Sequence, residues 1–181
     1  MKAAKILITL LIIIFSGAIS YYLYEQIETS GDTMVREIEE ETIVKGKLAF
    51  SVNESLEVGK ESTMNIVLDT NIYEVTGVDL AIKYNADEVE ILEIQDGNVF
   101  DAVYHNSVEK DKVLYSASVE LGKSYTGSDV IAMLKIKPKK VGTLTLSFFT
   151  TEEEATFVTY VGAVNNTEVP MSLSVGEFIV E

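Results

Sequence analysis

Apolar and polar positions alternate with a period of two along most of the chain. In "VTGVDLAIKY", residues 75 to 84, Leu80 and Ile82 alternate with Asp79 and Lys83. Side chains of a β-strand point to opposite faces in turn, so this alternation predicts a strand with one buried face and one solvent face. The solvent face of this strand is the first candidate for a functional surface.

Runs of this kind recur after residue 46, rich in Val, Ile, Leu, Phe, Tyr and Thr and separated by Gly, Asn and Asp. Short strands at intervals of about ten residues are typical of a β-sandwich. We therefore expect an all-β, antiparallel sandwich over residues 46–181, with about nine strands and no helix. The expected strands cover residues 46–52, 61–70, 75–84, 89–94, 112–121, 129–140, 142–149, 155–162 and 171–181.

The N-terminal 24 residues have a different pattern. Two lysines precede a charge-free apolar run over residues 6–24. As a helix, this run would reach roughly 28 Å, which matches the hydrocarbon thickness of a bilayer. It predicts a transmembrane anchor over residues 1–24 with the domain outside the cytoplasm, at the cell surface. The alternative is a cleaved signal peptide ending near Ser16-Gly17-Ala18, which would make the domain secreted.

Residues 25–45 connect this segment to the domain. They hold seven acidic and two basic residues, with few apolar positions. Such composition indicates an acidic spacer that is either partly helical or disordered.

Charge and residue content exclude several functions. The chain has 14 Lys and Arg against 29 Asp and Glu, a formal net charge of −15. This surface repels phosphate backbones, so we expect no nucleic-acid binding. There is no cysteine, and the one histidine, His105, lies in a polar stretch that we expect to be a loop. No nucleophile and base can be paired from such a set, so we expect neither an enzyme nor a resident cofactor.

Several short motifs occur in a recognisable order. The first half contains Val58-Gly59, then Gly77-Val78-Asp79, then Ile91-Leu92-Glu93, and ends with Gly97 and Phe100. The second half contains "KVLYSASVELGKSYTGSDVIAMLKIKPKKVGTLTLSF". Residues 46–181 with these motifs resemble cohesin domains. One departure is clear: Tyr84-Asn85-Ala86 stands where the family usually has Tyr-Asp-Pro.

This resemblance implies a nine-stranded jelly-roll sandwich that binds a protein partner. Cohesins capture dockerin modules, commonly in assemblies that degrade polysaccharides at cell surfaces. In that pairing calcium belongs to the dockerin, so no metal site is implied here. The partner lies across one sheet face, which includes the strand resembled by residues 75–84. The implied contact residues are Asp79, Ala81 and Lys83 on that strand and Leu114, Ser116 and Ser118 on the strand over residues 112–121.

Other interpretations remain open at this point. In one of them, Asp79 and Lys83 are simply the solvent side of an antiparallel sheet. Related sandwiches are carbohydrate-binding modules, and although the chain has no Trp, Tyr73, Tyr104 and Tyr125 are expected in loops where they would offer a sugar platform. A polysaccharide is therefore the alternative partner. A structural cell-surface subunit is a third possibility.

Overall fold

The computed structural model describes residues 43–150, 159–164 and 166–181. The expected anchor over residues 1–24, and nearly all of the expected spacer, lie outside these residues. Within the described part every regular element is a β-strand, as the alternating pattern predicts. Among the same residues, no helix has the length and apolar character that a membrane crossing needs.

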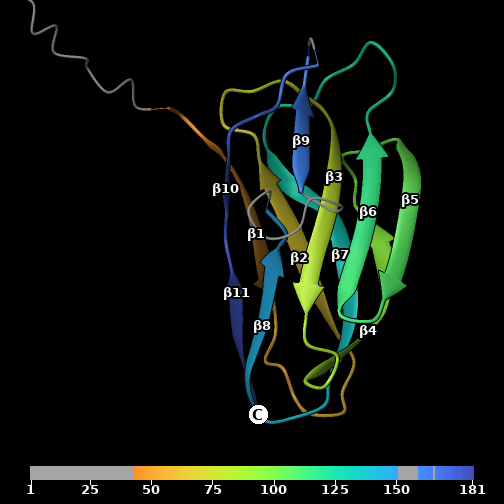
Figure 1. The fold of residues 1–181 in the computed structure, drawn as a ribbon, viewed down its shortest axis with the longest axis vertical. Helices are drawn as coiled ribbons and strands as arrows, with labels where there is room; N and C mark the ends of the chain where they lie inside the picture. Colours follow the sequence, from red (N-terminus) through yellow and green to blue (C-terminus); the bar gives the residue numbers. More distant parts are fainter. Residues whose placement is uncertain (1–42, 151–158, 165) are drawn as a thin grey trace, which may run out of the picture. The chain divides into compact units, whose positions relative to one another are not determined.

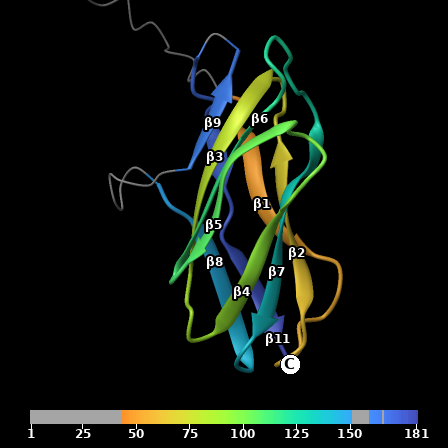
Figure 2. The same ribbon diagram turned by 90° about the vertical axis from the view of Figure 1, so that its right-hand side faces the viewer.

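The strands form two layers that face each other, and Figure 2 shows the layers side by side. The first layer is a five-stranded sheet in the order β10-β1-β2-β7-β4. Its strands are β1 (Gly46–Val52), β2 (Ser62–Asp69), β4 (Val89–Asp96), β7 (Ser128–Pro138) and β10 (Met171–Leu173).

The second layer is a six-stranded sheet in the order β11-β8-β3-β6-β5, with β9 also paired to β3 (Figure 1). Its strands are β3 (Val75–Tyr84), β5 (Ala102–Glu109), β6 (Lys112–Ser118), β8 (Gly142–Phe148), β9 (Tyr160–Ala163) and β11 (Gly176–Val180). Along one edge of β3, β9 pairs with the first half of the strand and β8 with its end. On the other edge β6 pairs with β3 over seven residues.

The core lies between the two layers and follows the alternation in the sequence. On β6, Val113, Tyr115 and Ala117 are buried while the residues between them are half-exposed. The rings of Phe50 and Phe148, from opposite layers, stack with centroids 4.4 Å apart. Burial of this apolar surface is the main favourable term for a domain without disulfides.

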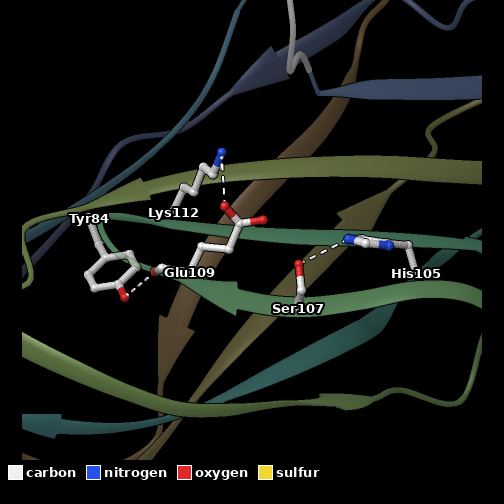
Figure 3. Close-up of polar contacts among 5 residues, drawn as sticks. All are labelled: Tyr84, His105, Ser107, Glu109 and Lys112. Carbon is white, nitrogen blue, oxygen red and sulfur yellow. Dashed lines mark hydrogen bonds and ion pairs between the residues drawn. The ribbon is translucent and has the colours of Figure 1, made fainter.

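Strand β5 was not expected, and the prediction that His105 lies in a loop is wrong. The strand runs at the edge of the six-stranded sheet and most of its side chains are exposed, so its sequence shows no apolar alternation. Its backbone pairs with β6, and the Asn106 side chain donates a hydrogen bond of 2.9 Å to the carbonyl of Ile94 in the other layer. Figure 3 shows His105 on β5 pointing toward Ser107, and His105 Nε2 lies 3.0 Å from the Ser107 hydroxyl.

The end of the chain also differs from expectation. Residues 171–181 form two strands instead of one, because the chain leaves the five-stranded sheet after Leu173 and enters the six-stranded sheet at Gly176. The described residues thus form eleven strands, not about nine. In addition β10 pairs with β1 in parallel, so the sandwich is mainly but not wholly antiparallel.

The turn after β3 explains the departure from the Tyr-Asp-Pro motif. The N–H of Ala86 donates a hydrogen bond of 3.0 Å to Asp111 Oδ1, which proline at this position would lack. The Tyr84 hydroxyl donates a bond of 2.7 Å to the carbonyl of Glu109, drawn in Figure 3. Hydrogen bonds to the β5–β6 turn therefore stabilise this turn in place of a proline ring.

We expect Leu134→Ala to lower the free energy of unfolding by about 2 to 5 kcal/mol. Leu134 is fully buried on β7, an interior strand of the five-stranded sheet, so the truncation leaves a cavity between the layers. Chemical denaturation of the full-length chain measures the effect. Leu121→Ala is the matched control, because Leu121 is fully exposed and its truncation should leave stability nearly unchanged.

A second prediction concerns alkaline pH. Burial, followed by the charge of Asp96, raises the pKa of Tyr115 to about 12. Because an unfolded tyrosine ionises near pH 10, the contribution of Tyr115 is complete below about pH 10 and is lost as the pH rises through 12. The free energy of unfolding should fall less steeply in this window for Tyr115→Phe than for the wild type. An equal slope in both proteins would contradict the assignment.

Candidate functional site

The outer face of the six-stranded sheet, which points away from the other layer, brings most of the predicted residues together. Strand register fixes which side chains are neighbours on this face. Along the second half of β3, three cross-strand rows pair Asp79 with Ser116, Ala81 with Leu114, and Lys83 with Lys112. We call these residues, together with Ser118, the docking face. The predicted set therefore lies on one surface.

Polar contacts order one end of the docking face. The Ser116 hydroxyl donates a short hydrogen bond to Asp79 Oδ1. The Ser118 and Tyr104 hydroxyls lie 3.0 Å apart. Asp79 is exposed and the two serines are half-buried. This group of polar side chains is therefore accessible to solvent.

Ala81 does not have the exposure that was predicted. It is 2% exposed, yet it does not belong to the core between the layers. Thr159 Oγ1 accepts a hydrogen bond of 3.2 Å from the Ala81 N–H and donates one of 3.0 Å to its carbonyl. Phe149 also donates its N–H to that carbonyl. These neighbours pair with the backbone groups of Ala81, and the nearly buried residue forms part of the floor of the face.

A groove of about 650 Å³ lies at the Asp79 end of the docking face. Asp79, Ser116 and Ser118 line it together with Tyr104, Tyr160 and Leu121, among others. Sequence reasoning named Tyr104 only for a sugar platform and missed Tyr160 and Leu121 as site residues. A register argument would have found Tyr160, because it pairs with Asp79 and must share its face. Tyr104 lies at a β-bulge between Val103 and His105, and no sequence pattern predicts that bulge.

Paired glycines explain why the groove is hollow. Gly77 on β3 lies directly beside Gly162 on β9, so this row has no side chains on those two strands. A Cβ atom at Gly77 would come within 2.9 Å of the Ala117 carbonyl oxygen. The glycine therefore permits close strand packing and also leaves room above the sheet.

The three tyrosines considered for a sugar platform lie in different surroundings. Tyr73 and Tyr125 are half-buried against the core, and the Tyr73 hydroxyl donates to the carbonyl of Val44 at 2.7 Å. Tyr104 lies in strand β5 instead of a loop and is 71% exposed. Together they do not form one exposed loop surface.

Ligands for a metal are not gathered on this surface. Within residues 43–150, 159–164 and 166–181, no cluster of three or more His, Asp or Glu side chains is suited to hold an ion. The chemistry that the docking face offers is thus hydrogen bonding, charge and a small apolar centre.

Comparisons with known proteins identify the fold. No family model matches the chain, and no curated protein sequence matches it. Among solved structures, a cohesin module from a Clostridium perfringens family 33 glycoside hydrolase superposes with a TM-score of 0.62 and 21% identity, covering 76% of this chain and 97% of that module. A non-cellulosomal cohesin from the archaeon Archaeoglobus fulgidus gives a TM-score of 0.62 and 11% identity, covering 76% and 92%.

A third similar structure was solved with a partner. The third ScaB cohesin of R. flavefaciens, in complex with a group 1 dockerin, gives a TM-score of 0.55 and 11% identity. It covers 76% of this chain and 95% of the cohesin. At these identities the likeness concerns the fold, and the described chain has a cohesin-like fold.

Proposed function

We propose that this chain is a cohesin-type binding module that docks a dockerin-type protein through the docking face. The observation behind the proposal is the cross-strand arrangement of Asp79 with Ser116 and of Ala81 with Leu114 on the outer face of the six-stranded sheet. The cohesin-like fold supports it, since one similar structure is a cohesin bound to a dockerin. The module acts by binding, without catalysis of its own.

The docking face has the composition that a helical partner needs. Leu114 is half-buried and offers a narrow apolar centre above Ala81, which is itself nearly closed to solvent. Asp79 stands above that centre as a hydrogen-bond acceptor, already aligned by Ser116. Binding energy at protein interfaces is concentrated in a few central residues with a polar rim around them. A partner helix lying over β3 and β6, along the strand direction, would bury the apolar centre and donate to Asp79.

The proposed location of the domain, outside the cytoplasm, is supported by the sequence. The apolar run over residues 6–24 supports a membrane anchor, and the acidic spacer then separates the domain from the bilayer. Docking at the outer surface would hold partner proteins near the cell, for example enzymes of a polysaccharide-degrading assembly. Any calcium needed for docking would belong to the partner.

The test is binding of the full-length chain to dockerin-type modules encoded in the same genome, measured by calorimetry with and without a calcium chelator. We expect wild-type binding that is lost on chelation, and Asp79→Lys should weaken it by about tenfold or more. The lysine removes the acceptor and places a positive charge on the face.

Glu54→Lys is the matched control, since it makes the same charge change at an exposed loop position between β1 and β2 of the other sheet. It should bind like the wild type. Equal loss in both variants would argue against the docking face. Retention on an insoluble polysaccharide, with no module bound, would favour the sugar-binding alternative, in which the exposed Tyr104 ring beside the groove would stack on a sugar.

A further inference from the structure

Chemical character changes in the same direction along two neighbouring strands of the docking face. On β3 the outward residues run from Asp79 through Ala81 to Lys83, and on β6 they run from Ser116 through Leu114 to Lys112. Each row therefore matches its neighbour: acceptor beside hydroxyl, apolar beside apolar, and lysine beside lysine. The docking face therefore has a direction: hydrogen-bonding groups lie at one end and lysines at the other.

Two hollows of opposite charge mark these ends. The groove at the Asp79 end is lined by three acidic residues, Glu74, Asp79 and Glu120, and by one lysine, Lys123. A second hollow of about 460 Å³ lies at the other end, and its lining contains three lysines, Lys83, Lys110 and Lys112, with one aspartate, Asp111. A cationic hollow is unexpected on a chain whose formal net charge is −15.

At the lysine end of the docking face, two positive side chains lie next to each other. Lys83 and Lys112 are directly opposite on adjacent antiparallel strands, and like charges in that position repel. Glu109 forms an ion pair of 3.0 Å with Lys112, visible in Figure 3, and Lys83 Nζ lies 5.8 Å from the centre of the Phe149 ring. These contacts orient the two side chains. An anionic group from outside would further reduce the repulsion.

We infer that the docking face selects the direction of its partner: the partner segment places carboxylates over Lys83 and Lys110 and hydrogen-bond donors over Asp79 and Ser116. This inference rests on the proposed docking function and names the chemistry of the occupant. Asp79 and Lys83 are four residues apart, which corresponds to roughly 13 Å along a strand. A helix of about nine residues has that length, so one amphipathic helix reaches both ends. The reverse direction would bring acids to the acidic groove and no carboxylates to Lys83 and Lys110.

The experiment reverses charges on both proteins. Dockerin-type modules from the same genome are the probes, and Kd is measured against the full-length chain. Lys83→Glu should weaken binding by about tenfold, and the effect should shrink at high salt. Lys47→Glu is the matched control, because Lys47 is an exposed strand lysine on the five-stranded sheet. It should leave Kd unchanged.

The direction in which the module binds is then determined from charge-reversed module variants that restore binding. Acidic residues of the bound module are changed to lysine one at a time. If the inference holds, one such variant restores binding to Lys83→Glu and does not restore it to Asp79→Lys. Equal effects of Lys83→Glu and Lys47→Glu would overturn the inference while leaving the proposed docking function in place. So would rescue of both face variants by the same module residue, which indicates two directions of binding. If the wild type binds no module, the proposed function fails and the inference fails with it.

Discussion

Pairing of β3 on both of its edges is the constraint on which the rest of the structure depends. Strand β6 holds one edge, while β9 and then β8 hold the other. A slip of one residue in this register would turn Leu80 and Ile82 outward and bury Asp79 and Lys83. The buried face of β3 therefore fixes the position of every residue on the docking face. The same strand register therefore determines both the stability of the core and the arrangement of the candidate functional residues.

The exchange of partners along β3 has a local consequence at Ala81. Strand β8 ends its pairing near Ile82, and β9 begins at Asp79, so the peptide group of Ala81 lies between them. Phe149 and the Thr159 hydroxyl satisfy its carbonyl, and the same hydroxyl satisfies its N–H. A buried peptide without such partners would be costly. Ala81 is also only 2% exposed, so the apolar centre of the face is narrower than a plain strand would provide.

The edge of the six-stranded sheet at β5 is irregular. At β5, a bulge and the bond from Asn106 to the other layer interrupt a flat run of backbone groups that would otherwise pair with another chain. The bulge also places Tyr104 beside Ser118 at the rim of the groove. Protection of the edge and construction of the groove thus come from one irregularity. The Gly77–Gly162 row completes the hollow from the opposite side.

Alternation in the sequence by itself determined the all-β class, the buried faces of β3 and β6, and the outward set from Asp79 to Ser118, because strand periodicity is a local property. Tertiary structure decided the rest. Edge strand β5 buries too little to show a pattern, and the separation of β10 from β11 depends on which sheet each one joins. The low exposure of Ala81, and the presence of Tyr104 and Tyr160 beside Asp79 in the groove, depend on contacts between residues distant in the sequence. Local periodicity indicates which way a side chain points, whereas pairing between strands decides what lies beside it and how much of it meets solvent.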